Sequence, residues 1–356
     1  MKLGIASGDW LSPAKAPDNL QHWGGSGWAR IGQYLPFLPA SYEVITGTLA
    51  WNTTHLSILD EFGNAHDVDV ILMQRLMHNG IDEAIKKSRA QGIKVINDID
   101  DWYWGVSTSN MAFNHNHPKT NPSENINHYS KTLAASDLVM CSTPYLMGRV
   151  SSFVHSRTEL LPNYVDAGKY PAHEDNGSTQ PLVGWVGSTA HRSGDIETLR
   201  GILDVMAKKD EVLLYHGGSA PNYPTFASKL GVPEHLVMTA PIATTEMYPS
   251  LMIMDIGVIP LANIPFNRAK SDIKGLEYAA AGIPFIAQNL DAYIDLQLSL
   301  GIGRTAKRAN NWISHLNELR LNPTLRQEEG AFNREAVQAR DIKIGAKRLV
   351  EILDSV

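Results

Sequence analysis

The sequence contains one cysteine in 356 residues, so an intramolecular disulfide is impossible. Cys141 stands in the apolar run DLVMCST, where we expect a small buried residue. A chain without disulfides is typical of a reducing compartment. Long apolar runs are missing too: none reaches the roughly 18 residues of a membrane span, and MKLGIASGDW lacks the apolar centre of a signal peptide. We therefore expect a cytoplasmic protein with no membrane anchor.

The sequence also has fewer basic than acidic residues. Lysine and arginine number 31 against 37 aspartates and glutamates, which gives a net charge of -6. This balance provides no general attraction to nucleic acid or anionic membranes, although a local basic groove is compatible with it. The dinucleotide fingerprint G-x-G-x-x-G does not occur. His115 and His117 lie in a polar stretch without a Cys or carboxylate ligand pattern, so no metal site is expected.

The dominant pattern of the sequence is an alternation between two kinds of segment. Short apolar runs rich in β-branched residues alternate with longer amphipathic stretches, the pattern of βα units around a parallel sheet. The expected strands are KLGIAS, YEVITG, DVDVILMQR, IKVINDID, DLVMCST and TELLPN, then PLVGWVGS, EVLLYHGG, LVMTAPI, DIGVIPL and IPFIAQ. The expected helices include GSGWARIGQYLPFL, GIDEAIKKSRAQG, PYLMGRVSSFV, DIETLRGILDVMAKK and TTEMYPSLMIM. The predicted fold class is therefore α/β with doubly wound sheets.

Two domains are expected, because the chain is longer than a typical single domain. The alternation stops at YPAHEDNGSTQP, which is rich in turn formers and charge. We predict an N-terminal Rossmann-like domain over 1–168, a linker over 169–181 and a C-terminal Rossmann-like domain over 182–340. The tail 341–356 is predicted to be a helix that packs back on the N-terminal domain, because the apolar residues of AKRLVEILDSV fall on one face.

The stretch AKSDIKGLEYAAA predicts a helix over 269–281, and its charged residues suggest a function. Lys270, Lys274 and Glu277 fall at i, i+4 and i+7, on one face. The helix follows the strand DIGVIPL, so its free amides and Ser271 should lie at the carboxyl edge of the sheet, where doubly wound folds bind ligands. From Lys270 to Glu277 the helix rises roughly 10 Å, comparable with the reach from a diphosphate to a ribose. A solvated face with a Lys–Glu pair is the alternative.

These segments resemble the retaining GT-B glycosyltransferases of the "glycosyl transferases group 1" family, similar to its family 4-like members from phages and bacteria. The resemblance rests on KSDIKGLEYAAAGIPFIA, YPSLMIMDIGVIPL, GWVGSTAHRSGDIETL and GGSGWARI. It implies two Rossmann-like domains facing each other across a cleft, with a nucleotide-sugar donor on the C-terminal domain and the acceptor on the N-terminal side. It also implies that Glu277 binds the donor ribose. A second glutamate usually stands eight residues earlier, where this chain has Ala269, so sugar contacts must come from other groups.

Small and basic residues in GWVGSTAHRSGD extend the candidate donor site. Gly187 and Ser188 follow an expected strand, and the glycine permits close backbone approach. His191 and Arg192 follow in the loop toward the next helix. Family members carry basic residues here, which implies that Arg192, together with Lys270, stabilises the departing diphosphate. The alternatives are an exposed loop arginine and, for His191, a loop or capping role.

The glycine-rich segment GGSGWARI lies at the first predicted helix of the N-terminal domain. The amides of Gly25, Ser26 and Gly27 are available to an anion, and Arg30 lies one turn into the helix. In similar enzymes this loop closes over the diphosphate and the acceptor, which implies the same here. A helix N-cap would also explain Ser26.

The segment NDIDDWYWG places acids and aromatics at the end of a strand. A metal-binding Asp-x-Asp is one interpretation of Asp98 and Asp100, but that motif belongs to a different glycosyltransferase fold. We expect these two residues to accept hydrogen bonds from donor-sugar or acceptor hydroxyls, at a position where many relatives have a histidine. The aromatic residues 102–104 either stack on sugar rings or pack in the core. Gln74 and Arg75 end another strand and also point to the cleft, with pairing to an interdomain acid as the alternative for Arg75.

The predicted function is transfer of a sugar from a nucleotide diphosphate sugar, a UDP-sugar in the first instance, to an acceptor hydroxyl. The resemblance implies retention of configuration and no metal or other cofactor. The catalytic candidates are Arg192, Lys270, Asp98 and Asp100. The acceptor stays open between a protein, a glycan and a modified DNA base, and nothing in the sequence indicates an oligomeric state. Two alternatives remain: a nucleotide-sugar 2-epimerase or hydrolase of the same fold, and a non-catalytic nucleotide-sugar binding module.

Overall fold

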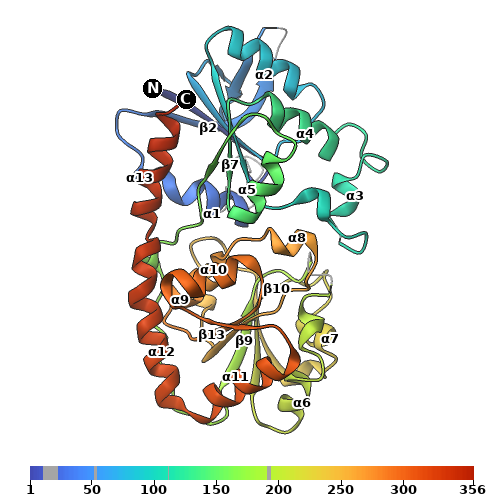
Figure 1. The fold of residues 1–356 in the computed structure, drawn as a ribbon, viewed down its shortest axis with the longest axis vertical. Coiled ribbons are helices and arrows are strands. Elements are labelled where there is room, and N and C mark those ends of the chain that lie inside the picture. The colour runs from blue at the N-terminus through green and yellow to red at the C-terminus, as the bar shows by residue number, and fades with distance from the viewer. Residues whose placement is uncertain (11–22, 52–53, 111, 191–193) are drawn as a thin grey trace.

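The computed structural model describes residues 1–10, 23–51, 54–110, 112–190 and 194–356, which form two α/β domains stacked end to end (Figure 1). Each domain is built around its own sheet, and helices cover the sheet faces. This arrangement confirms the predicted fold class. Within the described residues, no helix is both long enough and apolar enough to cross a membrane.

The N-terminal domain contains an eight-stranded sheet. Its strands are β1 (Lys2–Ser7), β2 (Glu43–Trp51), β3 (Leu56–Leu59), β4 (Ala65–His66), β5 (Val70–Gln74), β6 (Lys94–Ile99), β7 (Leu138–Cys141) and β8 (Arg157–Leu160). They lie in the order β4-β3-β2-β1-β5-β6-β7-β8, and all neighbours are parallel except the β2–β3 and β3–β4 pairs. The helices are α1 (Gly25–Arg30), α2 (Ile81–Ala90), α3 (Phe113–Asn116), α4 (Ile126–Ala135) and α5 (Pro144–Ser151).

The C-terminal domain contains a six-stranded sheet whose strand pairs are all parallel. Its strands are β9 (Leu182–Val186), β10 (Leu213–Ser219), β11 (Val237–Pro241), β12 (Ile256–Ile259), β13 (Phe285–Gln288) and β14 (Arg304–Ala306), in the order β11-β10-β9-β12-β13-β14. The helices are α6 (Leu203–Lys208), α7 (Phe226–Leu230), α8 (Pro265–Arg268), α9 (Ile273–Ala280), α10 (Asp291–Leu300), α11 (Ala309–Leu321) and α12 (Pro323–Ala336).

The sequence forms these sheets because its central strands are apolar on both faces. Every residue of β5, VILMQ, is buried, and so is every residue of β7, LVMC. Helices on both sides then cover the sheet with their apolar stripes; α2, for example, buries Ile81, Ala84 and Ile85 at helical spacing. The strand order reverses between β1 and β5 in the first sheet and between β9 and β12 in the second. These two switch points are where open parallel sheets form ligand crevices.

The C-terminal segment returns to the first domain. Helix α12 runs along the side of the C-terminal domain, and α13 (Ile342–Leu353) continues past the N-terminal domain toward the N-terminus (Figure 1). Side chains of α13, among them Ile342 and Leu349, pack in one core cluster with Leu3 and Ile5 of β1. The two domains are therefore joined by the α12–α13 connection as well as by the segment before β9.

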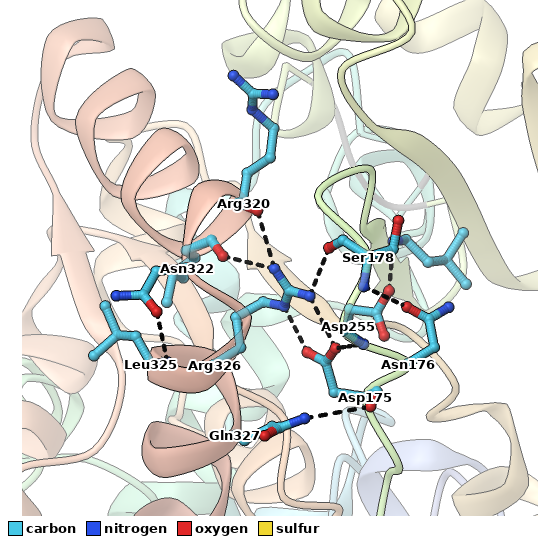
Figure 2. Close-up of polar contacts among 12 residues, drawn as sticks. Asp175, Asn176, Ser178, Asp255, Arg320, Asn322, Leu325, Arg326 and Gln327 are labelled. Atoms are coloured by element: carbon cyan, nitrogen blue, oxygen red, sulfur yellow. Dashed lines mark hydrogen bonds and ion pairs between the residues drawn. The ribbon is translucent and has the colours of Figure 1, made fainter.

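Arg326 of α12 binds the segment before β9 to the C-terminal domain (Figure 2). Its buried guanidinium forms a two-point ion pair with Asp175, at 2.5 and 2.8 Å, and also donates to the carbonyl oxygens of Ser178 and Leu319. All of these acceptors surround one planar donor group, which is the geometry in which an arginine fixes a loop most firmly. The stretch predicted as a linker is thus held against α12 at this point.

Four predicted helices differ from the structure. GSGWARIGQYLPFL is an α-helix only over Gly25–Arg30 and then a 3₁₀ helix over Gly32–Phe37. DIETLRGILDVMAKK is a 3₁₀ turn, Ile196–Leu199, followed by α6. The helix expected over 269–281 begins only at Ile273; Ala269 instead caps the end of α8, and its carbonyl accepts a hydrogen bond from Thr143. Lys270 consequently lies in the turn between α8 and α9. The segment TTEMYPSLMIM forms only a short 3₁₀ turn, Tyr248–Leu251, which includes Pro249.

Candidate active site

A cavity of about 580 Å³ lies between the two domains, at the carboxyl ends of both sheets. Its volume is within the range of small-molecule binding sites. Residues from both switch points line it, including Ser26, Arg75, Asp100 and Asp101 from the N-terminal domain and Gly187, Ser188, Lys270 and Glu277 from the C-terminal domain. The candidate site is therefore shared between the domains.

Helix α9 brings Glu277 and Lys274 to the wall formed by the C-terminal domain. Lys274 Nζ lies 2.8 Å from Glu277 Oε2, and the Tyr248 hydroxyl donates to the same oxygen at 3.0 Å. Lys274 also contacts the Tyr248 hydroxyl. Burial, and then the Glu277 carboxylate, raise the pKa of Tyr248 well above its usual value, so the phenol remains a neutral donor. The spacing i, i+3 on one helical turn is what places the cation beside the carboxylate.

Lys270 crosses the cleft to the N-terminal domain. Its Nζ lies 3.1 Å from Oδ1 of Asp101, which follows β6. The two side chains are 18% and 20% exposed, and both line the cavity. Burial raises the pKa of Asp101 against the opposing effect of Lys270. Asp101 is a site residue that sequence reasoning missed, although its place directly after a strand and beside Asp100 was a usable signal.

The pKa of Asp100 is lowered, in contrast to that of Asp101. Burial alone would raise the pKa of Asp100, but Arg75 and hydrogen bonds from Ser26 and Tyr103 outweigh burial and lower it. The Tyr103 hydroxyl donates to Asp100 at 2.8 Å. Asp100 lines the cavity as an ionised carboxylate, and so it can accept hydrogen bonds from hydroxyl groups of a ligand.

Asp98 differs from the sequence prediction because Arg30 takes up its carboxylate. Arg30 is 1% exposed and Asp98 is 0% exposed, and Nη2 lies 2.6 Å from Oδ1. The guanidinium also donates to the Leu161 carbonyl at 2.6 Å and to Asn163 Oδ1 at 2.8 Å. Burial lowers the pKa of Arg30 and the pairing with Asp98 raises it. The pairing outweighs burial, so the pKa of Arg30 is raised. A contact between Asp98 and a sugar hydroxyl does not fit this geometry; Asp98 instead holds Arg30 at the base of the cavity.

The glycine-rich segment is positioned by Asp9, another residue that sequence reasoning missed. The Gly27 amide donates to Asp9 Oδ2 at 3.1 Å, and Arg75 Nη1 lies 2.6 Å from the same oxygen. A side chain at Gly27 would meet the Asp9 Cβ at 2.8 Å, so glycine is required for this close approach. The predicted availability of the Gly27 amide to a ligand is therefore wrong, whereas Gly25 and Ser26 do line the cavity.

Arg75 pairs with an acid of its own domain, Asp9, and not with the interdomain acid of the alternative interpretation. Its backbone is left-handed, with φ of 56°, which is uncommon for a residue other than glycine. This conformation directs the guanidinium toward Asp9 and to 5.7 Å from the Tyr103 ring centroid. Both strand ends of the first switch point, β1 and β5, thus contribute a charged side chain to the cavity.

The aromatic residues after Asp101 divide between core and cavity. Trp102 belongs to a buried cluster of the N-terminal domain, and Trp104 stacks on Tyr129 at 6.0 Å. Tyr103 is buried as well, but it also lines the cavity. Ala269 is 0% exposed and packs in the same cluster, so the position where relatives carry a glutamate is here a domain contact.

Of the remaining predicted residues, Gly187 and Ser271 lie at the second switch point or near it. Gly187 follows β9 directly with φ of 149°, and its carbonyl accepts from His216 at 2.9 Å. Ser271 accepts from Asn163 at 2.7 Å across the cleft. His191 and Arg192 lie outside the described residues. No group of three or more potential metal ligands occurs within the part of the chain that the structure describes.

Comparisons with known proteins agree with this architecture. No family model matches the chain. Over 175 residues the chain is 24% identical to TuaH of Bacillus subtilis, which is named as a teichuronic acid biosynthesis glycosyltransferase; the match covers 47% of this chain and 44% of that protein. The chain therefore spans less than half the length of the curated relative it matches.

Solved structures match over the whole chain. The sucrose-phosphate synthase of Thermosynechococcus elongatus has a TM-score of 0.69 at 16% identity and covers 99% of this chain and 98% of its own. HepE of Anabaena, in complex with UDP-glucose, has a TM-score of 0.64 at 15% identity and covers 100% of both chains. These likenesses show the GT-B fold, which is the fold that the sequence resemblance implied.

Proposed function

From the GT-B fold we propose that this protein is a glycosyltransferase that moves a sugar from a nucleotide diphosphate sugar to an acceptor hydroxyl. The observation that carries the proposal is the cavity between the domains, where Lys270, Lys274 and Glu277 lie on one wall and Asp100 on the other. HepE has the same fold in complex with UDP-glucose, which supports a UDP-sugar as donor.

The donor would lie along α9. Glu277 would accept hydrogen bonds from the ribose hydroxyls, with Lys274 and Tyr248 holding its other oxygen in place. Lys270 lies in the turn just before α9 and would bind the diphosphate, together with Arg192. The backbone at Gly187 and Ser188 lines the same wall, and Gly25 and Ser26 would cover the phosphates from the other domain.

The chemistry needs little beyond charge stabilisation and positioning. As the bond from the anomeric carbon to the diphosphate oxygen breaks, negative charge grows on the leaving group and an oxocarbenium-like sugar develops. Lys270 and Arg192 would stabilise that leaving group, the kind of contribution that is often the largest in catalysis. The acceptor oxygen bonds to the same carbon, and its proton passes to the departing phosphate on the same face. We propose that this reaction proceeds with retention and without a metal ion.

Asp100 would orient the hydroxyl groups. It is ionised, it lines the cavity from the N-terminal domain, and Tyr103 and Arg75 hold it in position. A carboxylate of this kind accepts hydrogen bonds from a sugar or from the acceptor without acting as a nucleophile.

Since the relative TuaH is named for teichuronic acid biosynthesis, a glycan is the first acceptor class to test, ahead of a protein or a modified DNA base. The single cysteine supports a cytoplasmic location.

Product analysis tests the proposal. The protein is incubated with UDP-hexoses in EDTA, with and without glycan fragments, and nucleotide release and sugar products are followed by chromatography and NMR. Release that requires the acceptor, with the anomeric configuration of the donor kept in the product, supports the proposal. Release without acceptor would indicate a hydrolase, an isomerised sugar would indicate an epimerase, and binding without any reaction would indicate a binding module.

A further inference from the structure

The turn of residues 269–272, between α8 and α9, is docked on the N-terminal domain. The Ala269 methyl group is completely buried in the cluster that contains Trp102 and Tyr103. Its carbonyl accepts from Thr143 Oγ1 at 3.2 Å, and Ser271 Oγ accepts from Asn163 Nδ2 at 2.7 Å. The backbone on both sides of Lys270 is therefore fixed to the opposite domain.

Lys270 extends from this fixed turn into the cavity, and Asp101 receives its ammonium group. The Nζ atom lies 3.1 Å from Oδ1 and 3.4 Å from Oδ2, and 4.3 Å from the Phe266 ring centroid. Both members of the pair line the cavity and remain partly exposed. An anion that enters the cavity can thus reach the same ammonium that Asp101 holds.

We propose that Asp101 is a positioning residue that holds Lys270 across the cleft until the diphosphate of the donor displaces it. The inference rests on the proposed function, in which Lys270 binds the diphosphate. A diphosphate carries more charge than one carboxylate and offers more acceptor oxygens, so it is the stronger partner for a compact ammonium group. Once the diphosphate has taken the place of Asp101 beside Lys270, the two negative groups repel each other. The charge of Asp101 therefore weakens donor binding.

The surroundings of Asp101 make it a replaceable partner. Burial and the neighbouring Asp100 carboxylate raise the Asp101 pKa, while Lys270 and Arg75 act in the opposite direction. The Tyr103 hydroxyl is committed to Asp100. Lys270 is the cation that pairs with Asp101, and Asp101 reaches the reaction only through that side chain.

Calorimetric titration of the full chain tests the inference. UDP, ADP and GDP are titrated into the wild type, and the nucleotide that binds most tightly is then used with each variant, alongside its nucleoside without phosphates. We expect Asp101→Asn to tighten binding of the diphosphate by about threefold to tenfold and to leave nucleoside binding unchanged. Asp101→Glu keeps the charge and should not tighten binding. In a Lys270→Gln background, Asp101→Asn should give much less gain.

Asp166→Asn is the matched control, because Asp166 also lines the cavity but pairs at 3.7 Å with Lys169, its i, i+3 neighbour, and not across the cleft. Its affinity for the diphosphate should stay within about twofold of the wild type. Unchanged or weaker diphosphate binding in folded Asp101→Asn, as judged by circular dichroism, would overturn the inference. If Lys270→Gln itself left affinity unchanged, or no nucleotide bound the wild type, the proposed donor site would be wrong and the inference would fall with it.

Discussion

The buried pair of Arg30 and Asp98 allows a prediction whose size follows from the structure. In Asp98→Asn the shape of the side chain is kept but its charge is lost. Arg30 stays protonated and 1% exposed, with the Leu161 carbonyl and Asn163 Oδ1 as its remaining acceptors. Removal of one member of a buried pair leaves an uncompensated charge, which costs about 3–5 kcal/mol of unfolding free energy. That is a large part of the stability of a typical domain.

The assay is urea denaturation followed by tryptophan fluorescence and far-ultraviolet circular dichroism. We expect Asp98→Asn to lower the denaturation midpoint of the transition that involves the N-terminal domain by about 1–5 M for a urea dependence of about 1–3 kcal/mol per molar. The matched control is Glu83→Gln, which breaks an exposed pair with Lys86 and should leave the midpoint unchanged. The double change Arg30→Met and Asp98→Leu should recover much of the loss. An Asp98→Asn midpoint equal to that of the wild type would refute the reasoning.

Three further predictions concern the cleft and the core. Lys270→Ala should lower turnover by on the order of 100-fold or more in the transfer assay, whereas Lys169→Ala, which removes an exposed lysine at the same cavity, should change it only a few-fold; near-normal turnover would remove Lys270 from the mechanism. Ala269→Glu should destabilise the protein and lower activity, because the new carboxylate would be buried beside Trp102, and an Ala269→Glu variant with raised activity would contradict the observed docking. Burial raises the pKa of the Cys141 thiol to about 12, so a thiol reagent at pH 8 should label it only in denaturant, and rapid labelling of the native protein would contradict its burial.

The fold class was predictable because the apolar runs of the parallel strands are a local property of the sequence. VILMQ and LVMC read as strands buried on both faces, and both are buried completely. The edge strands β4 and β14 were not predicted, since their two and three residues carry too little pattern, and the four-residue strand β3 beside β4 was missed as well. Helix α4 was not predicted, because polar residues dominate its first turns.

The site was only partly predictable, because its geometry depends on pairs that are distant in the sequence. The partners Arg30 and Asp98 stand 68 positions apart, and nothing local distinguishes a paired acid from a free one. Lys270 was placed on a helix by its spacing, but Thr143 and Asp101 hold its turn on the other domain, 126 and 169 positions away. Glu277, in contrast, lies on α9 in the cavity wall, and its neighbour Lys274 follows from the i, i+3 spacing.

The central claim is that α9 forms the wall of a nucleotide diphosphate sugar site, and titration of nucleotides with a Glu277 variant tests it most directly. Calorimetry in EDTA with a panel of nucleoside diphosphates should show binding of one nucleotide to the wild type, about 10-fold to 100-fold weaker in Glu277→Ala, because hydrogen bonds to a charged group are lost. Glu351→Ala, which removes an exposed glutamate on α13, should bind as the wild type does. Wild-type affinity in Glu277→Ala, or a panel in which nothing binds, would contradict the account and leave Lys274 and Glu277 as a structural ion pair.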